Sequence, residues 1–287
     1  MPELPEVENI VRALRPKLCG KLIKEVEFAH HGIIAGTPRR ISDQKNSFSR
    51  LIRNKKIKGL SRKGKCIVFD LSNGYELGIH LGMTGQLLYR QKGRAIDRHT
   101  RMVFYFNDNL HELRFADMRR FGWVSLRSKM RRGVRPGEDK NAYLDNLGPD
   151  ALTLDLKGFK TRLSNRTGTV KGFLLNQHII SGLGNIYTDE SLYRAGIHPQ
   201  RKVNTLTEHE IKILHKAIGQ ILKEAIVCGG STVSTYRLPD GKEGEFQRQH
   251  KVYQRQGRPC PQCKTPIVRI KVAGRGTYFC PKCQGEN

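Results

Sequence analysis

The first eight residues, Met-Pro-Glu-Leu-Pro-Glu-Val-Glu, hold the most reactive combination of residue types in the chain. Removal of Met1 would leave Pro2 as a secondary amine close in sequence to the carboxyl groups of Glu3 and Glu6. A terminal amine has a pKa of roughly 7.7–8.0, so a useful neutral fraction exists near neutral pH. A neutral amine can attack a sugar aldehyde carbon and form a Schiff base, which is a charged iminium when the amine is secondary. The alternative is that Pro2 signals only removal of the initiator methionine.

Four of the seven cysteines form two Cys-x-x-Cys pairs near the C-terminus, with sixteen residues between the pairs. The four residues are Cys260, Cys263, Cys280 and Cys283. This spacing is typical of a closed tetrahedral site in which four thiolates hold one structural Zn²⁺. A disulfide pair or a redox-active pair is the alternative interpretation.

The segment between the two cysteine pairs predicts a hairpin over 267–279, with Arg275 at its glycine-flanked tip. An arginine presented in this way can enter a groove or contact a phosphate. The alternative is an exposed loop arginine with no role.

The charge balance is strongly basic, with 52 Lys and Arg residues against 26 Asp and Glu, a net charge of +26. The excess is concentrated in residues 39–65 and 119–135. Such an excess indicates a polyanionic partner and favours nucleic acid. A solvated face is the usual explanation of a charge run, and a membrane surface is a weaker alternative because no basic amphipathic helix dominates.

Membrane insertion and secretion are not indicated by the sequence. No apolar run approaches the roughly 18 residues that a membrane-spanning helix needs, and the N-terminus lacks the apolar core of a secretory signal. The isolated Cys19, Cys66 and Cys228 form an odd remainder that suits a reducing cytosol. We therefore expect a cytoplasmic protein.

Hydrophobic periodicity changes along the chain and predicts two kinds of structure. Residues 5–18 predict a leading helix, and 20–126 predict strands that include hairpins over 66–80 and 102–115. The turn-rich, basic stretch 127–148 predicts the domain junction. Helical periodicity follows in the stretches 153–163, 169–180, 186–195 and 207–227. The sequence thus predicts an α+β protein that begins with a β-sandwich.

Five motifs together resemble one family, the formamidopyrimidine-DNA glycosylases of the Fpg/Nei superfamily. They are Pro-Glu-Leu-Pro-Glu-Val-Glu (2–8), Ile-His-Leu-Gly-Met-Thr-Gly (79–85), Arg-Arg-Phe-Gly (119–122), Gly-Leu-Gly-Asn-Ile-Tyr (182–187) and the four-cysteine segment. The resemblance covers essentially the whole chain. It implies a catalytic β-sandwich domain over 1–130, a linker over 131–148, a helical DNA-binding domain with a helix-two-turn-helix motif over 149–245 and a zinc finger over 251–285.

The resemblance also implies an activity and catalytic residues. The family removes oxidised purines such as 8-oxoguanine and formamidopyrimidines from duplex DNA, then cuts the strand by β,δ-elimination. By motif, Pro2 matches the nucleophile, Glu3 the general acid and Glu6 a residue that shapes the same pocket. Lys65 matches the lysine of β-elimination and Arg275 the arginine of δ-elimination. Lys65 as a simple phosphate contact is the alternative.

The same matching implies DNA contacts. Met83, Arg119 and Phe121 match side chains that fill the space left by an everted base. Without the resemblance, Met83 and Phe121 would be predicted as core residues. The predicted phosphate contacts are His80, His99, Arg120, Arg166, Lys171 and Asn185, although a histidine such as His80 is more often structural. Residues about 231–246 match a loop that closes over the everted purine.

A few positions depart from the family pattern. Met118 stands where proline is usual, Asn176 where aspartate is usual and Gln254 where glycine is usual, and 30–46 is longer than the common form. A Nei-type glycosylase for oxidised pyrimidines and a non-catalytic zinc-ribbon DNA-binding protein remain as alternatives. The expected partner is duplex DNA with oxidised purines or abasic sites, bound by a monomer without an obligate protein partner or a membrane, in a bacterial-type cytoplasm in association with the nucleoid.

Overall fold

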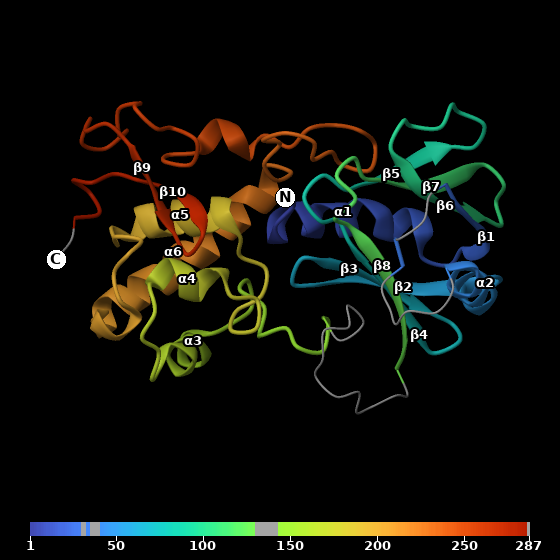
Figure 1. The fold of residues 1–287 in the computed structure, drawn as a ribbon, viewed down its shortest axis with the longest axis horizontal. Coiled ribbons are helices and arrows are strands. Elements are labelled where there is room, and N and C mark those ends of the chain that lie inside the picture. Colours follow the sequence, from blue (N-terminus) through green and yellow to red (C-terminus); the bar gives the residue numbers. More distant parts are fainter. Residues whose placement is uncertain (30–32, 35–40, 130–142, 286–287) are drawn as a thin grey trace. The chain divides into compact units, whose positions relative to one another are not determined.

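The chain divides into two compact units in the computed structural model, which describes residues 1–29, 33–34, 41–129 and 143–285 (Figure 1). The first unit comprises Met1–Asn146 and Gly229–Gly244, and the second comprises Leu147–Cys228 and Glu245–Asn287. The segment Gly229–Gly244 therefore groups with the first unit, although sequence boundaries place it within the helical domain. Most of the predicted linker, 131–142, lies outside the described residues.

The predicted leading helix is confirmed as α1 (Leu4–Leu18). Pro5 lies in its first turn, where a missing N–H has no cost. The side chains at positions 7, 10, 11, 14 and 18 are completely buried on one face of the helix. Burial of each such aliphatic side chain contributes about 1.5–3 kcal/mol. The helix is thus fixed to the first unit along its length, and its first residues are fixed with it.

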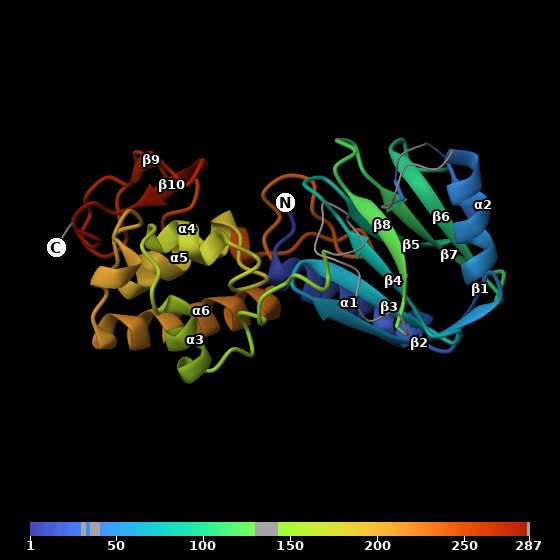
Figure 2. The same ribbon diagram turned by 60° about the horizontal axis from the view of Figure 1, so that its bottom comes forward.

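The first unit contains one antiparallel sheet of eight strands in the order β5-β7-β6-β1-β2-β3-β4-β8. The strands are β1 (Leu22–Phe28), β2 (Lys55–Lys63), β3 (Cys66–Leu71), β4 (Tyr75–His80), β5 (Gln86–Gln91), β6 (Thr100–Phe106), β7 (His111–Ala116) and β8 (Trp123–Ser128). Both predicted hairpins are confirmed, as β3–β4 and β6–β7. Strands β1 and β2 pair at only two positions, Leu22–Lys56 and Ile23–Lys55. The sheet therefore folds over at this point into two layers (Figure 2).

A single hydrophobic core fills the space between the two halves of this sheet and α1. Phe69 and Ile79 come from one half, and Phe104 and Phe115 come from the other. The short helix α2 (Ile41–Ile52) begins inside the 30–46 region and continues past it. Its Phe48 packs edge-to-face against the ring of Phe28, with 5.7 Å between centroids. The predicted sandwich of the α+β fold is therefore confirmed.

The second unit contains the four principal helices of the chain's C-terminal half. They are α3 (Leu156–Leu163), α4 (Val170–Leu175), α5 (Asn185–Ala195) and α6 (Glu208–Val227), with short 3₁₀ turns η2 (Val203–Thr205) and η3 (Phe246–Gln249). Side chains cap the helices: Asp155 accepts from Gly158 N–H, and Thr207 forms a capping box with Glu210.

Helix α4 is shorter than the leucine-rich stretch 169–180 suggests. It ends at Leu175 because Asn176 accepts a hydrogen bond from the His178 N–H, which starts a turn. Gln177 then bridges the turn, donating to Leu183 O and accepting from Gly182 N–H. Polar side chains therefore replace the helical ladder between α4 and α5.

A two-stranded hairpin closes the second unit. Strands β9 (Val268–Val272) and β10 (Arg275–Phe279) pair antiparallel, as the sequence predicts for 267–279. None of the helices in the described part of the chain has the length and apolar character to cross a membrane.

Candidate functional site

Four predicted catalytic residues gather at the beginning of the chain in the first unit. Pro2 is buried, and Glu3, Glu6 and Lys65 expose only 2 %, 1 % and 5 % of their surface. Lys65 belongs to the turn between β2 and β3, where Gly64 takes a positive φ of 56°. Charged side chains are rarely buried unless they are paired, so this concentration is a mark of function.

The electrostatic surroundings of the chain's first amine show that these groups are close together. Burial of the Met1 amino group lowers its pKa below the usual value. The carboxylates of Glu3 and Glu6 oppose this lowering, and the cations Lys65 and Arg119 add to it. The lowered pKa increases the neutral fraction of the Met1 amine, and neutral is the form in which an amine attacks carbon.

Glu6 connects the start of α1 to the segment 229–244. One carboxylate oxygen accepts the Glu3 N–H at 2.7 Å, and the other accepts the Ser231 N–H at 2.7 Å. Gly230 has a φ of +85°, and a β-carbon there would lie 2.8 Å from the Glu6 carboxylate. Tyr236 also packs here, and its hydroxyl donates to Gly229 O at 3.0 Å. The segment predicted to cover an everted base is therefore held against Glu6, one of the predicted catalytic residues.

Three side chains are predicted to fill the space left by an everted base, and they lie on two neighbouring loops of the first unit. Phe121 is 53 % exposed, which rules out the alternative that it is a core residue. Arg119 is exposed too, and its guanidinium lies over the Phe121 ring at 4.8 Å from the centroid. Met83 is half-buried in the loop between β4 and β5. An exposed aromatic ring under a guanidinium is suited to stacking against bases.

His80 lies at the end of β4 and stacks on Trp123, with 5.3 Å between ring centroids and 7° between planes. Its Nδ1 lies 3.1 Å from the Gly82 nitrogen and accepts that N–H. The proton of the neutral ring therefore sits on Nε2, a suitable phosphate donor. The other predicted phosphate contacts of this unit, His99 and Arg120, are exposed.

In the second unit, a buried ion pair supports the hairpin that carries Arg275. Lys171 and Asp189 are 2.6 Å apart, and neither side chain has exposed surface. Burial raises the pKa of Asp189 to about 7, while Lys171 and the Tyr278 N–H favour its charged form. Lys171 also approaches Gly276 O at 3.4 Å. The predicted phosphate contact by Lys171 is therefore not supported by its placement beneath the hairpin, and a supporting role fits better.

Asn185 contacts the backbone of the hairpin that carries Arg275. Asn185, the first residue of α5, donates from its side-chain amide to Gly276 O at 2.8 Å. Arg275 is exposed at the start of β10, next to Ala273 and Gly274 with positive φ angles of 49° and 73°. The tight turn thus leaves the guanidinium accessible. Arg166, also predicted to contact phosphate, is exposed after α3.

The four predicted zinc ligands come together in the second unit. The sulfur atoms of Cys260, Cys263, Cys280 and Cys283 all lie within 4.8 Å of one another. The Cys260–Cys283 and Cys263–Cys280 sulfur distances are 3.8 Å and 3.4 Å. Tetrahedral Zn–S bonds of about 2.3 Å require sulfur atoms roughly 3.8 Å apart. The residues therefore fit a structural Zn²⁺, with no ligand position left for substrate.

Sequence reasoning missed two buried carboxylates that organise these elements, Asp117 and Glu190. Glu190, 1 % exposed on α5, accepts the backbone N–H groups of three consecutive residues that lead to the ribbon, Lys251, Val252 and Tyr253. Asp117, 3 % exposed, accepts hydrogen bonds from Thr84 and Gly122, one on each of the two loops that carry Met83, Arg119 and Phe121. The only available signal was the position of Asp117 directly before the 118–122 loop.

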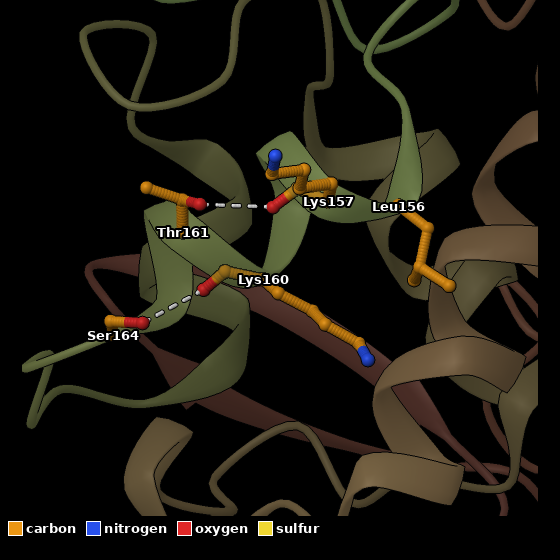
Figure 3. A pocket seen from close by; sticks show the side chains of 5 residues that line it. All are labelled: Leu156, Lys157, Lys160, Thr161 and Ser164. Carbon is orange, nitrogen blue, oxygen red and sulfur yellow. Dashed lines mark hydrogen bonds between the residues drawn. The ribbon is translucent and has the colours of Figure 1, made fainter.

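A pocket of about 400 Å³ on α3 lies apart from all the predicted site residues. Figure 3 shows the Thr161 and Ser164 hydroxyls directed at the backbone carbonyls of Lys157 and Lys160. The Lys160 ammonium is paired with Glu208 at 2.5 Å. The polar groups of the pocket are thus engaged within the helix and its neighbour, so we assign no function to it.

Family models match all three parts of the chain. The formamidopyrimidine-DNA glycosylase N-terminal domain matches residues 1–124, its H2TH domain matches 147–237, and the zinc finger found in FPG and IleRS matches 257–285. The chain belongs to the formamidopyrimidine-DNA glycosylase family. The resemblance expected from the five motifs is thereby confirmed.

Curated formamidopyrimidine-DNA glycosylases share 37–41 % identity with the chain over nearly its full length. The Listeria monocytogenes protein is 38 % identical over 99 % of this chain and 100 % of its own, and the Desulforamulus reducens protein is 41 % identical over 99 % of each.

Solved structures of the family share the fold. The Lactococcus lactis Fpg in complex with abasic-site DNA has a TM-score of 0.85 and 32 % identity, covering 99 % of this chain and all of that one. The Thermus thermophilus MutM protein has a TM-score of 0.84 and 39 % identity, covering both chains completely.

Proposed function

We propose that this formamidopyrimidine-DNA glycosylase family member excises oxidised purines, 8-oxoguanine and formamidopyrimidines, from duplex DNA and then cuts the strand as an abasic-site lyase. The observation that carries the proposal is the buried cluster of Pro2, Glu3, Glu6 and Lys65 at the chain's start. Relatives in complex with abasic-site DNA and with Fapy-dG DNA support the substrate class.

The proposed base excision uses Pro2 as a nucleophile after removal of Met1. The nitrogen lone pair of Pro2 forms a bond to C1′, and the bond from C1′ to the damaged base breaks, with its electron pair leaving on the base. The nitrogen, now cationic, loses its N–H proton to the departing base. Glu3 donates a proton to the sugar ring oxygen, the bond from C1′ to that oxygen breaks with its electron pair leaving on the oxygen, and the nitrogen lone pair forms the C1′–nitrogen double bond of an iminium. No electrons enter or leave, so no redox cofactor is required.

The proposed strand cleavage uses the iminium as an electron sink. Loss of a proton from C2′ drives breakage of the C3′–oxygen bond, and the phosphate leaves with that electron pair. Lys65 in the buried cluster is suited to moving this proton, and Arg275 on the hairpin is suited to the second, δ-elimination, because a cation stabilises charge on a leaving phosphate.

Duplex DNA must open for this chemistry, and we assign that step to exposed loops. Met83, Arg119 and Phe121 would fill the space left by the everted base. The phosphate contacts would come from His80, His99, Arg120, Arg166 and Asn185, with Lys171 acting from beneath the hairpin. The segment 231–246 would cover the everted purine, since Glu6 holds Ser231 beside the cluster.

One structural Zn²⁺ would hold the ribbon together through its four thiolates. We infer further that the protein works as a monomer on chromosomal DNA in a bacterial cytoplasm.

The decisive experiment is covalent trapping on abasic-site duplex DNA with borohydride. We expect an irreversible adduct with the processed protein and its loss in Pro2→Gly or in a form that retains Met1. Pro5→Ala is the matched control, since it alters a proline three residues away at the start of α1. Salt-sensitive binding without any adduct would contradict the proposal and support a non-catalytic DNA-binding protein.

Lesion preference is measured separately, on duplexes that contain 8-oxoguanine or thymine glycol. We expect 8-oxoguanine to be excised faster. Faster excision of thymine glycol would instead assign the chain to Nei-type activity while leaving the proline chemistry intact.

A further inference from the structure

One buried carboxylate holds the two loops that carry Met83, Arg119 and Phe121. Asp117 follows the last residue of β7 and is 3 % exposed, whereas the next four residues, 118–121, are all exposed. The chain thus passes from a buried anchor to an exposed tip within a single residue. Such a change requires strong local hydrogen bonding, because the tip makes little use of apolar burial.

Asp117 accepts hydrogen bonds from both loops. Its Oδ1 accepts the Thr84 hydroxyl at 2.5 Å, and its Oδ2 accepts the Gly122 N–H at 2.7 Å. The Arg119 N–H lies 3.0 Å from Thr84 Oγ1 and 3.3 Å from Asp117 Oδ1. Thr84 directly follows Met83, and Gly122 directly follows Phe121. A network of four residues therefore joins the backbones that carry Met83, Arg119 and Phe121.

The two loop backbones are also in direct contact. A β-carbon on Gly82, whose φ is +59°, would lie 2.5 Å from the Gly122 nitrogen. A β-carbon on Gly122 would lie 2.9 Å from His80 O. Backbones this close leave no room for one loop to shift without the other.

The chemistry of the network requires a carboxylate. An ionised carboxylate only accepts hydrogen bonds, and all of its partners here donate. Asparagine would present an N–H₂ group to one of these donors, and a buried donor would lose its partner. Hydrogen bonds to a charged acceptor are also the stronger kind.

We propose that Asp117 is a positioning residue for DNA opening: it joins the 82–85 and 117–122 loops so that Met83, Arg119 and Phe121 enter the duplex as one unit. This inference rests on the proposed function, since it presumes that these side chains fill the space left by an everted base. Asp117 itself touches no reacting atom.

The test compares Asp117→Asn and Thr84→Val with the wild-type protein. A 2-aminopurine placed next to the lesion reports unstacking by fluorescence, and the rise on binding is expected to be lost in Asp117→Asn. Excision of 8-oxoguanine from duplex DNA is expected to slow on the order of 100-fold, as misplacement by about 1 Å can cost. Thr84→Val, which removes one hydrogen-bonding hydroxyl, is expected to slow it about tenfold.

Trapping on a single-stranded abasic oligonucleotide separates positioning from general damage to the fold, because that substrate needs no opening. Both variants are expected to trap it at the wild-type rate. Glu112→Gln is the matched control, because Glu112 is about as buried as Asp117 and lies on β7, the strand that leads into Asp117, but pairs with Arg114. It is expected to keep the unstacking signal even where it lowers stability.

Normal unstacking by Asp117→Asn would overturn the inference, as would equal losses on single-stranded and duplex substrates. The unstacking measurement needs no chemistry. It therefore remains decisive if the wild-type protein forms no covalent adduct, an outcome that would overturn the proposed lyase chemistry alone.

Discussion

Glu6 shows how a single side chain connects segments far apart in the sequence. Its two carboxylate oxygens accept backbone N–H groups from Glu3 and from Ser231, 225 residues away. In Glu6→Gln the side-chain amide faces one of these donors, so a buried N–H loses its acceptor. We expect a stability loss of about 2 kcal/mol, typical of a broken hydrogen bond to a charged group. Urea unfolding measures this loss, and hydrogen exchange at the Ser231 amide should accelerate.

Glu8→Gln is the control for this prediction, on the same helix. Glu8 pairs with Arg12 and Arg62 at 2.8 Å and 2.9 Å, and the Arg12 side chain is 57 % exposed. The Glu8–Arg12 pair is partly solvated and worth about 1 kcal/mol or less. The Arg62 side chain is only 7 % exposed, so Glu8→Gln should also lower stability, but hydrogen exchange at Ser231 should stay unchanged in that variant. Unchanged exchange at Ser231 in Glu6→Gln would mean that this carboxylate does not hold the segment.

Sequence reasoning at the residue scale succeeded where a short motif determines which side chains meet, as with the four cysteines. It failed where a residue acts through distant partners. The sequence around Asp189 gives no sign of its role. That role becomes visible only in the fold, where Asp189 pairs with Lys171 and accepts the Tyr278 N–H. Lys171 was predicted to contact phosphate, but its side chain is buried. Burial depends on the fold of the whole unit and cannot be read from the local sequence.

At the scale of elements, we expect the ribbon to depend on a bound Zn²⁺. The buried cluster around the four cysteines is small: it comprises Val252, Ile267, Cys260 and Cys280, with Tyr193 and Tyr278 packed against it. Such a core cannot offset the conformational entropy of ordering the segment, so metal binding and folding are coupled. We expect a strong chelator to remove one Zn²⁺ per chain and to abolish amide protection in β9 and β10, while β3 and β4 in the first unit stay protected. Hydrogen exchange with mass spectrometry measures both regions.

Cys19→Ser is the control for metal removal, since Cys19 is exposed and lies far along the sequence from the four ligands. It should keep the metal, whereas Cys263→Ser should lose it. Retention of β9–β10 protection after complete chelation would show that Asp189 and Asn185 hold the hairpin without the ion.

Element prediction from sequence was reliable where periodicity is local, as for α1 and the β3–β4 hairpin. The place where the sheet folds over, between β1 and β2, could not be predicted from the sequence, because only two residue pairs define it. The return of Gly229–Gly244 to the first unit was also missed. Its cause is the Glu6 carboxylate and the positive φ of Gly230, neither of which has a signature in the segment itself.

At the scale of the whole molecule, the net charge of +26 greatly exceeds the number of basic side chains that we assign to DNA phosphates. The cations assigned to phosphates or their elimination are Lys65, Arg120, Arg166 and Arg275. Each neutralised phosphate contributes about −0.9 to the slope of log affinity against log salt concentration, so four predict a slope of about −4. Affinity for an abasic-analogue duplex should then fall on the order of 100-fold between 50 and 200 mM salt, measured by fluorescence anisotropy.

Variants test whether this salt dependence arises at the site or over the whole surface. Arg120→Gln should reduce the steepness of the slope by about 1. Arg194→Gln should leave it unchanged, because Arg194 forms a bidentate pair with Glu224 at 2.6 Å and 2.7 Å and is not assigned to DNA. A slope of about −8 or steeper would mean that many more basic residues contact phosphates. In that case the additional basic residues would belong to the DNA-binding surface. Long-range attraction alone would accelerate association, but it does not require each cation to contact a phosphate.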